Sequence, residues 1–142
     1  MSGLTRSTPT FSFNLMKILI IDDEPGFRVC LAHALSASGW KVFDYDEHAD
    51  FPALIREHDI DILVSDYRMA QVTGLDLIEN LRNAGIEIPA LILSGSLHAV
   101  DSERAKRLGV KAMLQKPPKM TELRCALIEA VANAASPNET GT

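Results

Sequence analysis

The chain has 142 residues, of which 46% are hydrophobic and 23% charged, and its formal net charge is −5. This length suits one domain with a sizeable core, and the acidic balance disfavours direct binding to nucleic acid. No apolar run reaches the ~18 residues that suggest a membrane span, and no basic segment followed by an apolar one marks a secretion signal. Cys30 and Cys125 lack CxxC spacing, which indicates reduced thiols and a cytoplasmic protein.

The first part of the chain alternates between strand and helix patterns. Residues 1–15 are rich in Ser and Thr without a sustained period, so we expect a mobile N-terminal extension. Lys17–Ile21 and Lys41–Tyr45 are expected strands, the second at a sheet edge because its ends are polar. Between them a helix begins at Pro25 and ends before Gly39. Its apolar stripe contains Phe27, Cys30, Leu31, Ala34 and Leu35.

The rest of the chain continues this alternation. Asp50 is a candidate N-cap for a short helix over Phe51–His58. Residues 62–64 form an apolar run typical of a strand buried on both faces, and the run stops at Ser65-Asp66. The elements expected next are a helix at 75–84, a strand at 90–94, a helix at 99–108, a strand at 111–115 and a last helix that Thr121 caps. That helix carries an apolar stripe of Leu123, Ala126, Leu127, Ala130, Val131 and Ala134, and a polar tail follows at 136–142.

Strand and helix thus alternate five times with short connections. Because crossovers between parallel strands are right-handed, this order implies a parallel sheet with helices on both faces. We therefore predict an α/β fold over residues 16–135, with a doubly wound five-stranded parallel sheet in which strands one, three and four are central.

Polar side chains with distinct chemistry follow four of the expected strands. Asp22 and Asp23 follow the first strand, Asp66 ends the third, Ser94 ends the fourth and Lys116 follows the fifth. Each has an ordinary structural explanation when taken alone, such as a helix cap, a turn residue or a solvated loop lysine. In a doubly wound sheet, however, the carboxyl ends of the strands share one crevice. Five such residues at these strand ends therefore indicate a functional site.

The chemistry of this set indicates a site for a metal ion and an oxyanion. Three carboxylates in one crevice repel one another unless a cation lies among them. Oxygen ligands favour a hard ion such as Mg²⁺. The ammonium of Lys116 and the hydroxyl of Ser94 suit an oxyanion with several oxygens, such as a phosphoryl group. Asp66 can receive that group because carboxylates form acyl phosphates.

With these residues, the sequence resembles the receiver domains of two-component response regulators over about residues 16–135, in a stand-alone form similar to the chemotaxis regulators. Asp22 and Asp23 match the acidic pair of the family, Asp66 its phosphoacceptor, Ser94 its switch hydroxyl and Lys116 the lysine of its Lys-Pro motif. Gly74 matches the glycine that opens the third helix. The resemblance implies a flavodoxin-like (βα)5 fold with the strand order 2-1-3-4-5, and a cis peptide bond between Lys116 and Pro117.

The resemblance also implies the roles of the site residues and the partners. Asp23, Asp66 and the backbone carbonyl of Arg68 would bind Mg²⁺ directly, and Asp22 would act mainly through water. The phosphoryl donor would be a phosphohistidine on a sensor histidine kinase or a histidine phosphotransfer protein. Lys116 and Ser94 would contact the phosphoryl oxygens. The output would be a docking surface around helix 4, strand 5 and helix 5, with no direct nucleic-acid contact and no membrane.

Three departures from the family pattern affect these expectations. Ala70 stands where the family often has Pro after Met, Met113 stands where it usually has an aromatic ring, and Pro118 replaces a common Phe. The aromatic part of the family's switch is therefore missing. Slow self-dephosphorylation is expected, since neither Arg68 nor Ser96 is suited to orienting an attacking water.

Two other classes of function remain alternatives. A binding module that is not phosphorylated would not need the complete set of acceptor, acidic pair, hydroxyl and lysine. A flavoprotein would need a phosphate loop where this chain has acids, and a haloacid-type phosphatase would carry its nucleophile on the first strand. We therefore expect a signalling protein that catalyses only its own phosphoryl transfer and dephosphorylation. A downstream protein or a second copy would dock on the last helix, whose outer strip is Arg124, Cys125, Ile128, Ala132 and Ala135.

Overall fold

The computed structural model describes residues 15–135, which form a five-stranded parallel sheet in the order β2-β1-β3-β4-β5. The strands are β1 (Lys17–Ile21), β2 (Lys41–Tyr45), β3 (Ile62–Asp66), β4 (Ala90–Ser94) and β5 (Val110–Gln115). The helices are α1 (Pro25–Ser36), α2 (Phe51–His58), α3 (Gly74–Asn83), the 3-10 helix η3 (Leu97–Ala99), α4 (Ser102–Arg107) and α5 (Met120–Ala135). The predicted fold class and strand order are confirmed. The expected N-terminal extension, apart from Leu15, and the polar tail lie outside the described residues.

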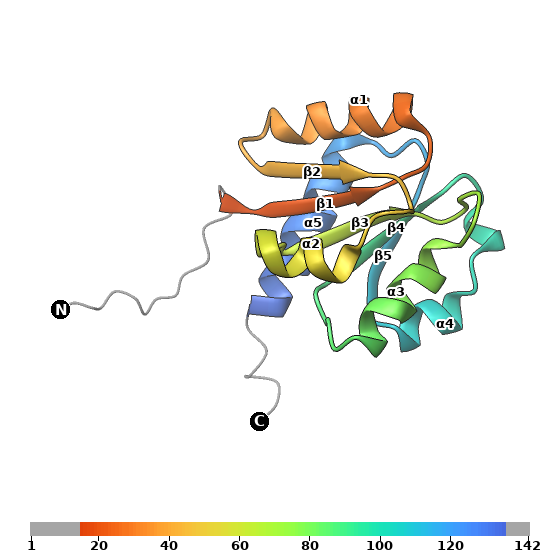
Figure 1. Ribbon diagram of the computed structural model, residues 1–142. Helices are drawn as coiled ribbons and strands as arrows, with labels where there is room; N and C mark the ends of the chain where they lie inside the picture. The colour runs from red at the N-terminus through yellow and green to blue at the C-terminus, as the bar shows by residue number, and fades with distance from the viewer. Residues whose placement is uncertain (1–14, 136–142) are drawn as a thin grey trace.

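Helices cover both faces of the sheet, and each face has its own hydrophobic core (Figure 1). Alternate side chains of one strand enter opposite cores, as the period of two requires. Ile18 and Ile20 of β1 pack with α1 and α5, whereas Leu19 and Ile21 pack with α2, α3 and α4. Every residue of β3 and β4 is buried, while β2 and β5 form the partly exposed edges. The prediction that the second strand is an edge is therefore correct.

The starts of two helices, α4 and α5, differ clearly from the prediction. The helix expected at 99–108 is shorter, because Leu97–Ala99 forms a 3-10 turn and Asp101 then caps α4 by accepting a hydrogen bond from the amide of Arg104. Thr121 is not the cap of α5, since the helix already begins at Met120 and the amide of Leu123 donates to the carbonyl of Lys119. By contrast, the predicted cap Asp50 does accept from the amide of Ala53.

Two side chains of the predicted apolar stripes face outward. Cys30 on α1 and Ala134 near the end of α5 are exposed, although the spacing placed both with the core. Small and weakly polar side chains tolerate exposure, so helical spacing alone does not decide their burial. In the outer strip of α5, Cys125 and Ile128 are exposed as predicted, and Ala132 is half-buried. The side chain of Ala135 lies outside the described part.

Between residues 15 and 135, none of the helices has the length and apolarity needed to span a bilayer.

Candidate functional site

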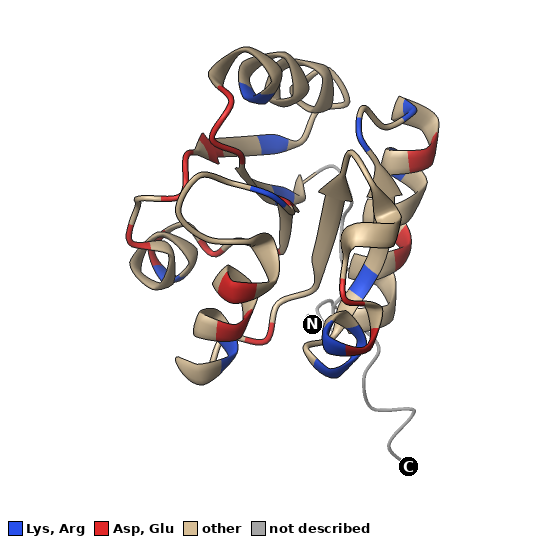
Figure 2. Ribbon diagram, turned by 90° about the vertical axis from the view of Figure 1, so that its right-hand side faces the viewer, with Lys and Arg blue, Asp and Glu red and all other residues tan. Residues whose placement is uncertain are grey.

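The parallel register brings the ends of the strands to one edge of the sheet. Ile21 pairs with Ser65, Asp66 with Leu93, and the next residue of β4 pairs with the end of β5. Figure 2 is turned toward this edge and shows acidic segments in red on the loops that leave the strands. The residues predicted from the four strand ends are therefore brought together by the topology.

Asp22, Asp23 and Asp66 form an acidic cluster in which one carboxylate oxygen from each residue lies within 4.8 Å of the others. Asp22 and Asp66 are buried, with exposed fractions of only 1% and 7%. The amide of Glu24 donates to Asp22 at 2.9 Å, and the amide of Ala70 donates to Asp23 at 2.9 Å. Such a group of oxygen donors could hold a hard metal ion.

Lys116 supplies the positive charge within this cluster. Its Nζ lies 3.0 Å from an oxygen of Asp22, 3.4 Å from one of Asp66 and 3.5 Å from one of Glu24. Burial lowers the pKa of Lys116, but the hydrogen bond and charge of Asp22 and the charge of Asp66 outweigh it and raise that pKa above its ordinary value. The ammonium is therefore charged throughout the neutral range.

One ammonium does not neutralise the acidic cluster. The pKa of Asp66 is raised to about 6, first by burial and then by the negative charge of Asp22, although Lys116 acts in the opposite direction. The pKa values of Asp66 and Lys116 are both raised, and the two shifts are consistent. Three carboxylates stabilise the charged form of the lysine, whereas the charged form of Asp66 is also opposed by burial and by two acidic neighbours. A further cation would thus be bound favourably beside Asp66.

Ser94 and Lys116 lie next to each other across the ends of β4 and β5. The Ser94 hydroxyl donates to the carbonyl of Ser96 at 2.8 Å and accepts from the Ser96 amide at 3.2 Å. The Lys116 amide donates to the Ser94 carbonyl at 2.8 Å. The Lys116–Pro117 peptide bond is cis, as the resemblance implied. Ser94 and Lys116 therefore face the same cleft as Asp66.

The loop after Asp66 runs along the rim of this cleft and ends at Gly74. Arg68 lines the cleft and pairs with Thr73 in an isolated antiparallel bridge. Gly74 packs so closely that an added Cβ would lie 2.5 Å from the Asp66 carbonyl oxygen. Ala70, where the family often has Pro, provides the amide that donates to Asp23. The loop is thus held at Ala70 by Asp23 and at Gly74 by close packing against the end of β3.

Sequence reasoning missed two contributors to the site on α1. The Phe27 ring, predicted only as part of the apolar stripe, lies 4.4 Å from the Lys116 Nζ. The Arg28 guanidinium donates to the Asp22 carbonyl at 2.8 Å and forms an ion pair with Asp44 at 3.0 Å. A signal was available for Arg28, because it lies in the first turn of the helix that follows the two aspartates. No pattern in the sequence links Phe27 to residue 116, which is far away in the chain.

The strand ends therefore form a crevice in a doubly wound α/β protein, lined by Asp23, Asp66, Ser94 and Lys116, whose acidic cluster could hold a metal ion. A family model described as "Response regulator receiver domain" matches residues 18–128, and the chain belongs to this family. Receiver domains are signalling domains that pair with histidine kinases or histidine phosphotransfer proteins.

Similar proteins agree with this assignment. The chain is 34% identical over 103 residues to "Regulator of RpoS" from Escherichia coli (strain K12), which covers 72% of the chain and 31% of the relative. It therefore spans about a third of that relative's length. A receiver domain protein from Clostridium thermocellum superimposes with a TM-score of 0.76 at 24% identity, covering 85% of this chain and 98% of that one. The chemotaxis protein CheY4 from Vibrio cholerae gives 0.74 at 22%, covering 82% and 98%. These two structures support the fold.

Proposed function

We propose that this chain is a phosphoacceptor response regulator in which Asp66 takes a phosphoryl group from a phosphohistidine of a sensor kinase or phosphotransfer protein. The observation that supports it best is the position of the Asp66 carboxylate, which lies at the end of a central strand, 3.4 Å from the Lys116 Nζ and within the acidic cluster. Asp66 also lines the cleft, so a donor can reach it.

The transfer needs only one bond to form and one to break. An oxygen of ionised Asp66 attacks phosphorus, and a mixed carboxylic–phosphoric anhydride forms. The phosphorus–nitrogen bond to the donor histidine breaks, and its electron pair stays with the imidazole, which is released after taking up a proton. With a pKa of about 6, Asp66 is mainly ionised at neutral pH and can act as the nucleophile.

The remaining residues stabilise charge on the transferred group. The Lys116 ammonium would exchange contacts with carboxylates for contacts with phosphoryl oxygens. The Ser94 hydroxyl would turn from the Ser96 carbonyl toward the same oxygens, and this change would carry the signal. Met113, half-buried against the core under α2, α3 and α4, would adjust its flexible side chain in place of an aromatic ring.

The acidic cluster fits Mg²⁺, because it offers hard oxygen donors and an excess of buried negative charge. Asp23, Asp66 and the Arg68 carbonyl would hold the ion, and Asp22 would act mainly through water. When bound, the ion would neutralise charge on the phosphoryl oxygens.

The proposal also includes the output of the domain. A downstream protein or a second copy of this chain would dock around α4, β5 and α5, where Ile128 of the outer strip is 36% exposed and available for contact.

The test is phosphorylation by acetyl phosphate in MgCl2, followed by intact-mass measurement. One acid-stable, base-labile phosphoryl group is expected on the wild-type chain, none on Asp66→Asn, and much less on Asp23→Ala. The matched control is Asp101→Asn, because Asp101 caps α4 and does not line the cleft, so its change should not affect labelling. Equal labelling of Asp66→Asn and wild type would disprove the assignment. If the wild type neither gains a phosphoryl group from acetyl phosphate nor binds beryllofluoride, a binding module that is not phosphorylated would be favoured.

A further inference from the structure

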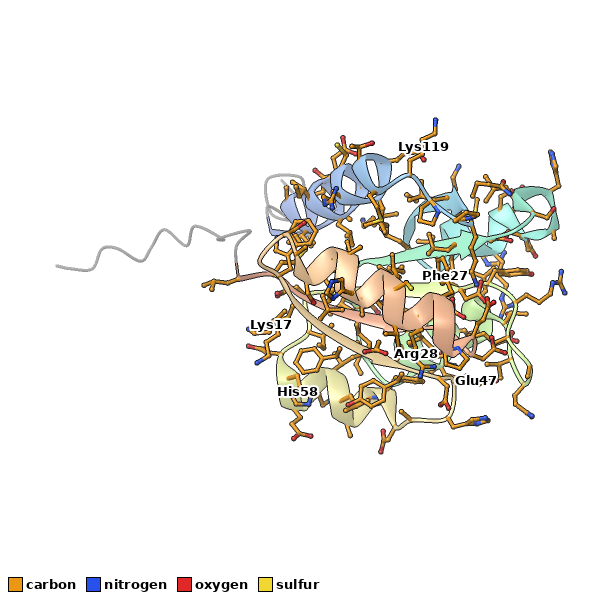
Figure 3. The ribbon with its side chains drawn as sticks, turned by 90° about the horizontal axis from the view of Figure 1, so that it is seen from above. Lys17, Phe27, Arg28, Glu47, His58 and Lys119 are labelled. Atoms are coloured by element: carbon orange, nitrogen blue, oxygen red, sulfur yellow. The ribbon has the colours of Figure 1, made fainter. Side chains whose placement is uncertain are left out.

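Phe27 is a cleft residue to which the proposed reaction gives no role. It lies near the N-terminal end of α1 beside Arg28 (Figure 3), and it lines the cleft together with Asp66 and Lys116. The Lys116 Nζ is 4.4 Å from the centroid of the Phe27 ring. This distance is well within the ~6 Å at which the face of an aromatic ring attracts a cation. The side chain of Lys116 is only 16% exposed, and low exposure to water strengthens this attraction.

The other close neighbours described for this ammonium are carboxylates. Asp22, Glu24 and Asp66 all lie within 3.5 Å of the Nζ. An ammonium has three N–H donors, so these carboxylates together can use all of them. Each contact that Lys116 makes to a phosphoryl oxygen must therefore replace a contact to a carboxylate. The aromatic ring differs from them, because it attracts the cation without adding a net negative charge that would repel the phosphoryl group.

We propose that Phe27 is a positioning residue for Lys116. Its ring holds the ammonium in the cleft while the N–H donors change from carboxylate to phosphoryl oxygens. This inference rests on the proposed phosphoacceptor function and adds a residue to it. An aliphatic side chain at position 27 would fill much of the same space but would leave the ammonium to the carboxylates alone, so the lysine would be less well placed for the phosphoryl group.

The first experiment tests the contact in the unphosphorylated protein. Protons held over an aromatic face resonate upfield, so NMR of the Lys116 ε-methylene protons reports the geometry directly. We expect an upfield shift in the wild type and in Phe27→Tyr, and an ordinary position in Phe27→Leu. Val29→Ala is the control, because Val29 lies on the same helix and is 57% exposed; it should keep the shift. An ordinary position in the wild type, or an upfield shift that persists in Phe27→Leu, would overturn the contact.

The second experiment tests the role, by measuring the dissociation constant of beryllofluoride, a phosphoryl mimic, in MgCl2. Phe27→Leu should bind roughly 3- to 30-fold more weakly than the wild type, and Phe27→Tyr within about twofold of it. A residue that only packs would be replaced well by Leu, so equal binding by Phe27→Leu would overturn the positioning role while leaving the proposed function intact. If the wild type binds neither beryllofluoride nor a phosphoryl group, the proposed function fails and the role fails with it. The NMR shift still reports separately whether the contact exists.

Discussion

The pKa values of two aspartates, one in the acidic cluster and one in a group of charges on the surface, are shifted in opposite directions although each aspartate has a basic partner. The surface cluster consists of Arg104 on α4 with Asp76 and Glu79 on α3, at 2.9 Å and 2.6 Å. A hydrogen bond from the Thr73 amide, and then one from Arg104, hold the pKa of Asp76 below its ordinary value. The pKa of Asp66 is raised to about 6 although Lys116 lies beside it.

Burial and the balance of charges explain the difference. The carboxylates of the surface cluster are nearly half-exposed, so water stabilises them, and Asp76 also forms a capping box with Thr73. In the acidic cluster, the almost fully buried carboxylates of Asp22 and Asp66 share a single lysine, and the carboxylate of Asp23 lies close to both of them. The negative charges of the surface cluster are therefore compensated by Arg104 and by water, whereas the cleft keeps a deficit of positive charge. Such a deficit favours the binding of a further cation.

The largest effect should follow the removal of Lys116. Lys116→Met leaves buried carboxylates without their cation, so the free energy of unfolding at pH 7.5 should fall by about 3 kcal/mol. The raised pKa of Lys116 means that its contribution is complete at this pH and is lost only as pH rises above about 10.5. The loss should shrink below pH 6, where Asp66 takes up a proton. Urea unfolding curves without Mg²⁺, recorded at pH 7.5 and below pH 6, measure the loss of stability and its decrease at low pH.

Lys119→Met is the matched control for that experiment. Lys119 is exposed and projects outward at the start of α5 (Figure 3), so its removal should change stability by less than about 0.5 kcal/mol. Equal losses for the two lysine variants would mean that the cleft lysine contributes no more than a surface charge.

An intermediate effect, of opposite sign, is expected for Asp66→Asn. Because the pKa of Asp66 is about 6 in the folded protein and near 3.8 when unfolded, ionisation destabilises the wild type as pH rises through this window. Without Mg²⁺, the variant should therefore be more stable by about 1–2 kcal/mol at pH 7.5, allowing for solvent screening, and equal to the wild type at pH 3.5. Unfolding curves at several pH values measure the difference. A difference that does not vary with pH would show that Asp66 is not the group responsible.

The smallest effect should come from the surface cluster. Arg104→Gln should lower the free energy of unfolding by only about 0.5 kcal/mol at pH 7, and 1 M NaCl should remove most of this loss. The lowered pKa of Asp76 means that its contribution is present above its ordinary pKa and is lost as pH falls below it. Thr73→Ala, which removes the capping hydroxyl, should cost about 1 kcal/mol independently of salt. A large, salt-independent loss for Arg104→Gln would contradict the contrast between the two clusters.

The sequence was most informative where periodicity and topology act together. The apolar run before Ser65-Asp66 correctly indicated a strand buried on both faces, and the alternation of elements correctly predicted a parallel sheet with helices on both faces. The strand order was correctly implied by the resemblance to receiver domains. Because parallel strands share one carboxyl edge, residues at their ends could be predicted to meet. Their individual roles, including the metal ligands and the phosphoacceptor, stay predictions until the labelling experiments are done.

What the sequence did not reveal depends on contacts between distant segments. The stripe that contains Phe27 explains its burial against the core, but its contact with Lys116 exists only once α1 and β5 have packed on the same sheet. Cys30 and Ala134 show the limit of spacing as a guide to burial, since small side chains suit both environments. The start of α4 depends on local hydrogen bonding. Leu97–Ala99 forms a separate 3-10 turn, and Asp101 then accepts a hydrogen bond from the Arg104 amide and caps the helix.

The close packing of Gly74 has a consequence for how mutations in this protein would be read. A methyl group at position 74 would press on the backbone of Asp66 and on the side chains of Ser65 and Ile92, at 2.5–3.0 Å. The backbone atom cannot rotate away, so even Gly74→Ala must displace the end of β3. A saturation mutagenesis screen would therefore rank Gly74 beside the ionisable residues of the cleft, although it has no side chain to offer a substrate. Intolerance in such a screen marks the residues that hold the geometry as well as those that do the chemistry.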